Sequence, residues 1–515
     1  MRTYWIAALA MGLAAAEAAG AADLWQLAKD KRLVHQFSTL FTAQDVRDRL
    51  SDDAGLDAAI DWCRKTGVTK VYLETFRDGY QAERATLEKA KERFSAAEFE
   101  VSGCVTTTQV GKPSTGWKPI SCYTDLTTQN RVQSIFEYAA GLFNEIMIDD
   151  FWFTDCTCAK CDAARRLQTV NLAGRTFHVE GQTWEDYRRE LMWRLSRERI
   201  LAPARRVNRY VRVILKYPEW YDRLQEAGYD VTRETADFDK IWVGTETRDR
   251  DRGGSVPYQA YFIMRWLGAL GGKKTGGGWY DPLRTTPPTY LEQARQTVLA
   301  GARESMLFCY GALGRDNGPA DVEALRAGIP ELLATAEQMR LRTAVGIAAY
   351  KPANSYGQNE PYVFGYAGML GLPLLPTDRF PEEAPAAFFS AQALKDPDLI
   401  LKLTLYITSG RPTLITDSLA EHLDPKVLKG HNVRILPVKG DPKSLLRLGG
   451  QELEAIRAPL LQPLNTTFHG PNEVGLYLFA DGSYVVENFG AQEAAVELNG
   501  AAFKVPARGW VSRWR

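Results

Sequence analysis

The sequence predicts an α/β protein made of a (β/α)8 TIM barrel, a flavodoxin-like α/β domain and a small C-terminal β-sandwich. Three observations lead to this fold class. Strand-like and helix-like segments alternate over roughly the first 300 residues, as βα units do in a barrel. Shorter strands and helices alternate again up to residue 465, and only strand-like segments follow. At 515 residues the chain is also too long for one hydrophobic core.

The barrel is predicted over residues 23–320, where eight short apolar segments are each followed by a longer polar or amphipathic one. The expected strands are 33–41, 70–76, 98–108, 145–153, 212–220, 238–248, 276–280 and 304–313. Apolar residues have helical spacing in 56–65, 80–97, 129–142, 183–209, 257–270 and 290–302. An open doubly wound sheet is the alternative, because it is built from the same units.

Two further domains are predicted after the barrel. The flavodoxin-like domain, 321–465, begins with a helical segment and continues with short strands separated by helices; the strands are 343–350, 412–415 and 433–437. The β-sandwich, 466–515, contains strand-like alternation, and Asp481–Gly482 is a strong hairpin signal.

Charge and the N-terminal segment bear on partners and localisation. The formal net charge is zero, which gives no electrostatic reason to expect nucleic acid or an anionic membrane as partner. Residues 1–22 have the pattern of a secretory signal peptide: Arg2, an apolar run, and the small-residue cleavage motif Ala16-Glu17-Ala18. The run is short for a membrane span, so an uncleaved anchor is the less favoured alternative. We therefore expect a periplasmic or secreted protein with no membrane association after cleavage.

Carboxylates are expected at the end of the barrel where the active site of this fold lies. Neighbouring strand residues point to opposite sides, so one of Asp149 and Asp150 faces the mouth, and we favour Asp150. Glycosidases commonly use one carboxyl as acid and one as nucleophile or base, and we predict Asp150 and Glu246 as this catalytic pair. The alternatives are that Asp150 caps its loop and that Glu246 forms an ion pair with Arg248 or Lys216. The carboxylates at the expected strand ends are Glu74, Asp149, Asp150, Glu219, Glu246 and Asp281.

Further polar and aromatic side chains near the strand ends are candidates for substrate binding. Polar groups hydrogen-bond sugar hydroxyls, and aromatic faces stack on sugar rings. The alternatives are that Glu74 only holds Arg77 and that most tryptophans pack in the core or in loops. The candidates are Glu74, Asp149, Trp152, Lys216, Tyr217, Arg248, Trp279 and Asp281.

Four cysteines predict a metal site. Cys156, Cys158 and Cys161 form a C-x-C-x-x-C cluster just after the fourth strand, too tight for unstrained disulfides between neighbours. Cys122, after the third strand, is the expected fourth ligand, with Cys104 as the alternative. Four thiolates leave no open position on zinc, so the predicted zinc ion is structural. A disulfide pair with free thiols is the other possibility.

With these features the chain resembles glycoside hydrolase family 42, the zinc-bearing β-galactosidases. The resemblance implies a barrel, an α/β trimerisation domain and a C-terminal β domain in this order, and hence a homo-oligomer, a trimer. It also implies a four-cysteine zinc site, here Cys122 in SCYTDLTTQNR together with the CxCxxC cluster. The family's catalytic residues are not matched: its Asn-Glu pair is Asp149–Asp150 here, and its seventh-strand Glu has no counterpart in GGGWYDP. The resemblance therefore implies the scaffold but not β-galactosidase activity.

The function expected from these features is that of a secreted glycoside hydrolase acting on an oligosaccharide or glycoside through Asp150 and Glu246. A non-catalytic carbohydrate-binding or scaffold protein on the same fold is the alternative. A zinc hydrolase is less favoured, because it needs an open metal site with histidine or carboxylate ligands and the five histidines are scattered.

Overall fold

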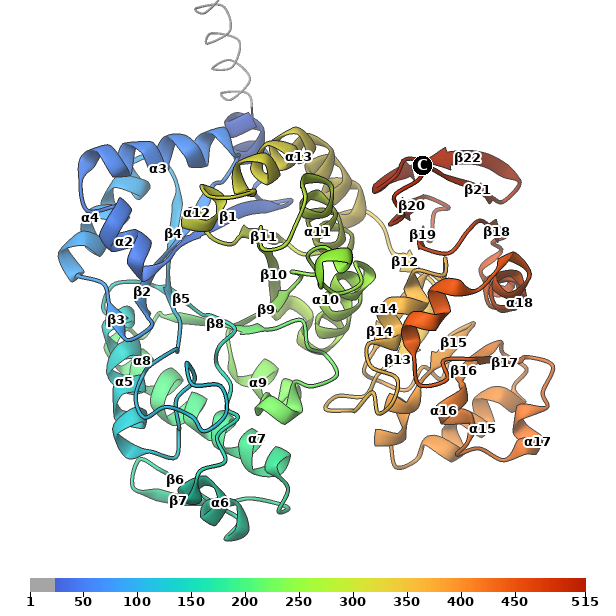
Figure 1. The fold of residues 1–515 in the computed structure, drawn as a ribbon, viewed down its shortest axis with the longest axis horizontal. Helices are drawn as coiled ribbons and strands as arrows, with labels where there is room; N and C mark the ends of the chain where they lie inside the picture. The colour runs from blue at the N-terminus through green and yellow to red at the C-terminus, as the bar shows by residue number, and fades with distance from the viewer. Residues whose placement is uncertain (1–23) are drawn as a thin grey trace, which may run out of the picture.

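The N-terminal part of the chain is a closed barrel of parallel strands (Figure 1). The computed structural model describes residues 24–515, so the expected signal peptide, 1–22, lies outside the described residues. The eight parallel strands follow one another around the barrel, and pairing of β1 with β2 closes it. The predicted barrel is thus confirmed and the open sheet is wrong. The strands are β1 (Gln36–Phe41), β2 (Lys70–Arg77), β4 (Glu100–Val105), β5 (Glu145–Ile148), β8 (Arg212–Tyr217), β9 (Lys240–Gly244), β10 (Thr275–Tyr280) and β11 (Glu304–Leu307).

Helices surround the barrel, and several begin at a residue that caps the helix. Asp52, Asp125 and Thr183 each accept a hydrogen bond from a backbone N–H of the first turn, which satisfies a donor that the helix itself cannot. The main outer helices are α3 (Asp53–Lys65), α4 (Arg84–Ala96), α5 (Leu126–Ala140), α7 (Trp184–Leu195), α8 (Ala202–Val207), α10 (Tyr258–Gly271), α11 (Pro287–Leu299) and α13 (Gly318–Arg340).

Two local features differ from the sequence-based expectation. The helix expected over 80–97 begins only at Arg84, because Tyr80–Gln81 forms the short strand β3 and pairs antiparallel with β2. A hairpin of β6 (Thr169–Leu172) and β7 (Arg175–His178) follows the cysteine cluster and was not anticipated. Both are short two-stranded pairings, whose weak periodicity explains why the pattern did not predict them.

The barrel interior is arranged in layers, because every second residue of a strand points inward. The middle layer takes one apolar side chain from each strand: Leu40, Tyr72, Cys104, Met147, Ile214, Trp242, Trp279 and Met306. Two residues earlier on three of these strands lie Lys70, Glu145 and Glu304, whose ion pairs of 2.8 and 3.2 Å close the N-terminal end. Two residues later the same alternation delivers polar groups to the opposite end, which is the mouth of the barrel.

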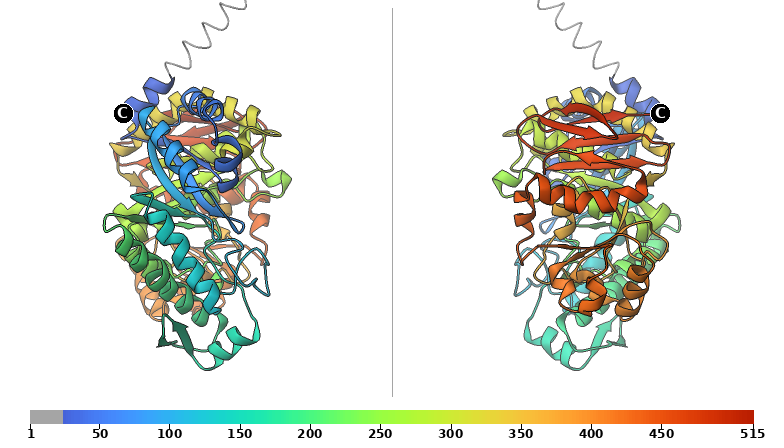
Figure 2. Two further views of the ribbon diagram at one scale, coloured as in Figure 1. Left: turned by 90° about the vertical axis from the view of Figure 1, so that its left-hand side faces the viewer. Right: turned by 90° about the vertical axis from the view of Figure 1, so that its right-hand side faces the viewer.

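The second domain contains a parallel sheet beside the barrel (Figures 1 and 2). Its spatial order is β14-β13-β15-β16-β17, the 2-1-3-4-5 order of flavodoxin-like folds. Asp222, in the loop after β8, accepts a hydrogen bond from the backbone N–H of Tyr362 (2.5 Å), so this domain contacts the barrel near its mouth. The strands are β13 (Ile347–Tyr350), β14 (Leu374–Thr377), β15 (Ala387–Phe389), β16 (Thr413–Thr416) and β17 (Val433–Leu436).

The C-terminal residues, joined by the short strand β12, form two small antiparallel sheets, seen in red in the right-hand view of Figure 2. The hairpin expected at Asp481–Gly482 is present, with Gly482 at φ 82°, a conformation that glycine adopts without strain. Within residues 24–515, no helix has the length and apolar character needed to cross a membrane. The sheets contain β12 (Ala344–Val345), β19 (Val474–Phe479), β20 (Tyr484–Asn488) and β23 (Gly509–Arg513), and β18 (Phe468–His469), β21 (Ala494–Leu498) and β22 (Ala501–Val505).

Candidate active site

Asp149 is the inward-facing aspartate of the fourth barrel strand. It follows Met147 by two residues and continues the inward series just past the end of β5. Its carboxylate accepts from Lys216 Nζ (2.5 Å), Arg77 Nη2 (2.6 Å) and Thr106 Oγ1 (2.9 Å). Burial alone would raise its pKa, but the charges of Lys216 and Arg77 outweigh burial and hold the pKa well below its usual value. Asp149 is therefore ionised, and its oxygens are occupied by protein donors.

Glu74 belongs to the same network on the second strand. Its carboxylate accepts from Arg77 Nε (2.8 Å), from the backbone N–H of Ala43 (2.8 Å) and from Thr106 Oγ1. It is fully buried, and burial raises its pKa. The alternative that Glu74 holds Arg77 is therefore what the structure shows.

Asp150 lies beyond the strand, in the turn after β5, and is only partly buried. Its backbone carbonyl accepts from the Tyr229 hydroxyl (2.9 Å), which anchors the turn. Within residues 24–515 no backbone N–H donates to its side chain, so it is not the loop cap that the sequence left open. Burial and then the adjacent Asp149 charge raise the pKa of Asp150 to about 7, against the charges of Lys216 and Arg77.

Glu246 occupies a space that a glycine leaves open. The inward position after Trp242 is Gly244, and a Cβ there would lie 2.5 Å from Glu246 Oε2. Glu246 is 7% exposed, and among the described residues its Oε2 has no hydrogen-bond partner. Burial and then the charges of Glu219, Asp150 and Asp281 raise its pKa well above the usual value. Glu246 is thus a buried carboxyl beside three other carboxyls, which disfavour its ionised form.

Glu219, after the fifth strand, is a third carboxyl of this cluster. Its oxygens accept from Ser255 Oγ (3.0 Å) and Gln259 Nε2 (3.3 Å). Burial raises its pKa to about 7, and the Arg248 charge acts in the opposite direction. The sequence placed Glu219 at a strand end but did not include it in the site; its signal was the Pro-Glu-Trp that follows the strand.

Arg248 and Asp281 form a bidentate ion pair beside this cluster. Arg248 Nε and Nη2 lie 3.0 and 2.7 Å from the two Asp281 oxygens. Because Arg248 is paired with Asp281 and Lys216 with Asp149, neither is the ion-pair partner of Glu246 that the alternative required.

Three aromatic candidates lie in the interior. Trp279 is 3% exposed and lies below Lys216, whose Nζ is 3.8 Å from the ring centroid. Trp152 is buried, and its indole N–H donates to Ser196 Oγ (2.9 Å). Tyr217 is buried and points away from the lumen, with its hydroxyl on Glu234 of α9 (Val231–Asp237). Trp152 and Tyr217 are therefore packing residues and do not reach the mouth, because strand alternation and loop packing turn them outward.

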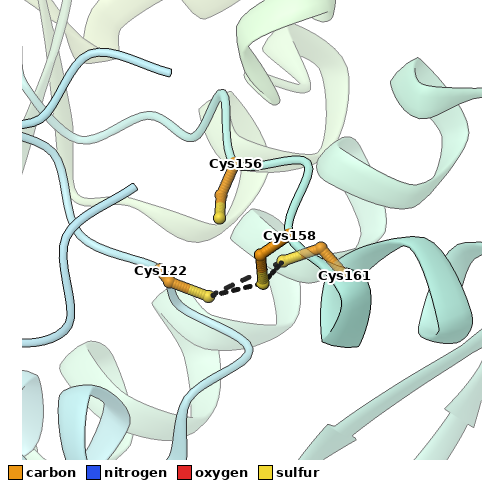
Figure 3. Close-up of side chains that lie close together, drawn as sticks. All are labelled: Cys122, Cys156, Cys158 and Cys161. Carbon is orange, nitrogen blue, oxygen red and sulfur yellow. Dashed lines mark hydrogen bonds between the residues drawn. The ribbon is translucent and has the colours of Figure 1, made fainter. Parts of the chain in front are cut away.

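The structure brings four cysteine sulfurs together, from the loops after β4 and β5 and from α6 (Ala159–Arg166) (Figure 3). All four lie within 4.8 Å of one another, and three pairs are 3.6–3.8 Å apart. Zinc–sulfur bonds of about 2.3 Å in a tetrahedron give sulfur–sulfur edges of about 3.8 Å, so the geometry fits zinc. None of the described cysteines is in a disulfide, and Cys104 lies in the barrel lumen instead. The four are Cys122, Cys156, Cys158 and Cys161.

Comparison with known proteins finds a glycosyl hydrolase family in sequence and a glycosidase among similar structures. The family described as "Probable glycosyl hydrolase, catalytic domain" matches residues 21–323. An uncharacterized protein of Saccharolobus solfataricus, SSO3021, is 27% identical over 333 residues; the match covers 60% of this chain and about half, 55%, of that protein. α-L-Fucosidase isoenzyme 2 from Paenibacillus thiaminolyticus has a TM-score of 0.65 at 9% identity, covering 93% of this chain and 98% of that one. At this identity the likeness shows a shared fold.

Proposed function

We propose that this chain, which belongs to the family of probable glycosyl hydrolase catalytic domains, cleaves an oligosaccharide or glycoside with Glu246 as the acid and Asp150 as the nucleophile or base. The hydrolase class follows from the family; the residues and the substrate are the proposal. One observation carries the assignment: Glu246 is a buried carboxyl with an unpartnered oxygen, and burial, followed by the charges of Glu219 and Asp150, raises its pKa. Asp150, by contrast, has Lys216 and Arg77 nearby, which favour its ionised form. Two carboxyls in such different environments can act as acid and base at one site.

Glu246 suits the acid role because its environment favours the neutral form. Burial and then three neighbouring carboxylates raise its pKa well above the usual value, which favours the protonated form. Its free Oε2 is available to donate that proton to the glycosidic oxygen as the bond to the sugar breaks.

Asp150 suits the role of nucleophile or base because two nearby cations favour its ionised form. Lys216 and Arg77 favour its ionised form, although burial and Asp149 bring the pKa to about 7. An ionised Asp150 attacks the anomeric carbon directly or takes a proton from the attacking water. The anomeric configuration of the first product, read by NMR, distinguishes these two routes.

The remaining groups of the cluster suit the binding of sugar hydroxyls. Glu219 is held by Ser255 and Gln259, and Asp281 fixes the Arg248 guanidinium. Groups with locked orientations bind a hydroxyl at little entropic cost. Glu74, Asp149 and Lys216 are instead paired within the protein: Arg77 bridges Glu74 and Asp149, and Lys216 donates to Asp149.

We further propose that the four cysteines bind a structural zinc ion. The ion would join the loop after β4, through Cys122, to the loop after β5, which contains Asp150 and carries Cys156 and Cys158. A zinc with four thiolate ligands takes no part in the reaction and holds these loops at the mouth. Secretion remains a proposal that rests on the sequence of residues 1–22.

The catalytic pair is tested by comparing substrates whose leaving groups differ in their need for protonation. A panel of 4-nitrophenyl glycosides, α and β, identifies the sugar; the fluoride of that sugar and an oligosaccharide ending in it then serve as substrates. Glu246→Gln should lose about 100- to 10,000-fold in kcat on the oligosaccharide but much less on the fluoride, which needs little acid assistance. Asp150→Asn should lose activity on both substrates, and the exposed Glu83→Gln should be unaffected.

The other outcomes are also decisive. Wild-type turnover by both variants would show that the pair is wrong, and a leaving-group dependence in Glu219→Gln instead would transfer the acid role to Glu219. Hydrolysis of no sugar, with sugar binding retained, would favour a non-catalytic carbohydrate-binding protein.

A further inference from the structure

We propose that Trp117, Phe151 and Trp220 form a second sugar-binding subsite, which takes the pyranose ring next to the one cleaved. The inference rests on the proposed function and extends it, because it requires a substrate of at least two sugar rings. None of these three residues belongs to the carboxylate cluster, but the chain brings them to its edge.

The position of the aromatic group follows from its neighbours in sequence. Phe151 directly follows Asp150, and Trp220 directly follows Glu219. Both rings are partly buried, so part of each stays accessible. Phe153 packs against Trp220, with ring centroids 5.5 Å apart and the rings edge-on. Two members of the group are therefore next in the chain to two of the clustered carboxyls, Asp150 and Glu219.

Trp117 supplies the exposed ring of the group. It comes from the loop after β4 and stacks on Phe153, with centroids 6.2 Å apart and planes 4° from parallel. Its centroid is also 5.4 Å from that of Phe151. Yet the side chain is 45% exposed. A large aromatic ring held in place and left in water is typical of a binding surface for a ring with an apolar face.

The loop that carries Trp117 is fixed before any ligand arrives. The Trp117 backbone N–H donates to Asp155 Oδ2 (2.6 Å), and Ser114 Oγ donates to Asp155 Oδ1 (2.5 Å). A Cβ at Gly116 would lie 2.4 Å from the same carboxylate, so the loop closes tightly over Asp155. A ring already ordered in this way loses little entropy when it binds, which favours a pre-formed subsite over simple loop packing.

The chemistry of the group indicates the ligand. Flat aromatic surfaces recognise the C–H face of a pyranose, and the adjacent hydroxyls need polar groups, which the nearby carboxyls supply. The four side chains of the group are uncharged and offer apolar ring faces: they are Trp117, Phe151, Phe153 and Trp220. A neutral oligosaccharide fits it best.

The test compares substrates with and without a second ring. Trp117→Ala should lower kcat/KM about 10-fold on an oligosaccharide and leave the fluoride of its terminal sugar unaffected, since the fluoride has no second ring. Trp117→Phe should recover most of the loss. Leu167→Ala, an equally plain truncation of a 72% exposed side chain outside this group, should change neither substrate.

Equal effects of Trp117→Ala on both substrates, including no effect, would overturn the subsite while leaving the catalytic assignment intact. If wild type hydrolyses none of these sugars, the proposed activity fails separately, and calorimetric binding of the same oligosaccharides decides the subsite. Weaker binding by Trp117→Ala than by wild type would support it, and equal binding or none would overturn it.

Discussion

Gly244 leaves the space in which the Glu246 carboxylate lies, and filling that space should disable the enzyme. A Cβ added at Gly244 would lie 2.5 Å from Glu246 Oε2, 3.0 Å from Oε1 and 2.8 Å from the backbone nitrogen of Glu219. Ordinary contact begins at 3.4 Å, so Oε2 must retreat by about 0.9 Å. In Gly244→Ala the acid therefore leaves the position from which it donates its proton.

The expected cost is large for so small a change. A misplacement of about 1 Å at a reacting group lowers the rate about 100-fold, or about 2.7 kcal/mol in the activation free energy. The clash with Glu219 adds overpacking strain of about 1–3 kcal/mol in the free energy of unfolding. We expect kcat on an oligosaccharide to fall about 100-fold, with a smaller loss on the sugar fluoride.

The assay is steady-state hydrolysis together with thermal unfolding of the same preparations. Gly268→Ala is the matched control, because it makes the same change in α10, where nothing lies within 4 Å of the added Cβ. It should keep wild-type kinetics. A folded Gly244→Ala with the kcat of wild type would refute the placement of Glu246 as the acid, since the side chain could not then have been needed where it lies.

Two further predictions concern pH and metal. Activity requires Asp150 ionised and Glu246 protonated, so kcat/KM on an oligosaccharide should rise as pH passes about 7 and fall at higher pH, where Glu246 loses its proton. Asp149→Asn removes a charge that raises the Asp150 pKa, so the rising limb should move to lower pH; a profile that stays in place would contradict the electrostatic account. Protein purified with zinc should hold about one ion per chain, and Cys158→Ser should lower both the zinc content and the unfolding temperature, whereas Cys63→Ala, outside the cluster, should keep the zinc. Full zinc content in Cys158→Ser, or none in the wild type, would contradict the site.

Much of the architecture was predictable because local patterns carry it. Six of the eight barrel strands fall within the segments expected from short apolar runs, and β2 and β10 each extend one residue beyond theirs, since buried parallel strands need such runs whatever their neighbours are. The C-x-C-x-x-C spacing indicated a metal site without any knowledge of the fold, because three thiols that close in sequence must lie close in space. The helix expected from residue 183 does begin there, with Thr183 as its cap, whereas α3 begins at Asp53, three residues before the expected 56, because Asp52 caps it.

The roles of individual carboxylates were less predictable. Strand alternation alone would have placed Asp149 inward, two residues after Met147, yet we favoured Asp150 as the residue facing the mouth. The structure shows both at this end of the barrel, but in different states. Asp149 is neutralised by cations from two other strands, while Asp150 lies in the turn beyond. No sequence pattern reports which cation pairs with which anion, because the partners are far apart along the chain.

From the sequence alone follow the number and order of the barrel strands, the positions of the carboxyls near their ends and the spacing of three of the clustered cysteines. Each of these depends on residues a few positions apart. Only the tertiary structure decided that Cys122 completes the cluster, that Arg248 belongs to Asp281, and that Glu246 fills the space left by Gly244. The physical reason is closure of the barrel, which sets the distances between side chains on different strands and, with those distances, their charges.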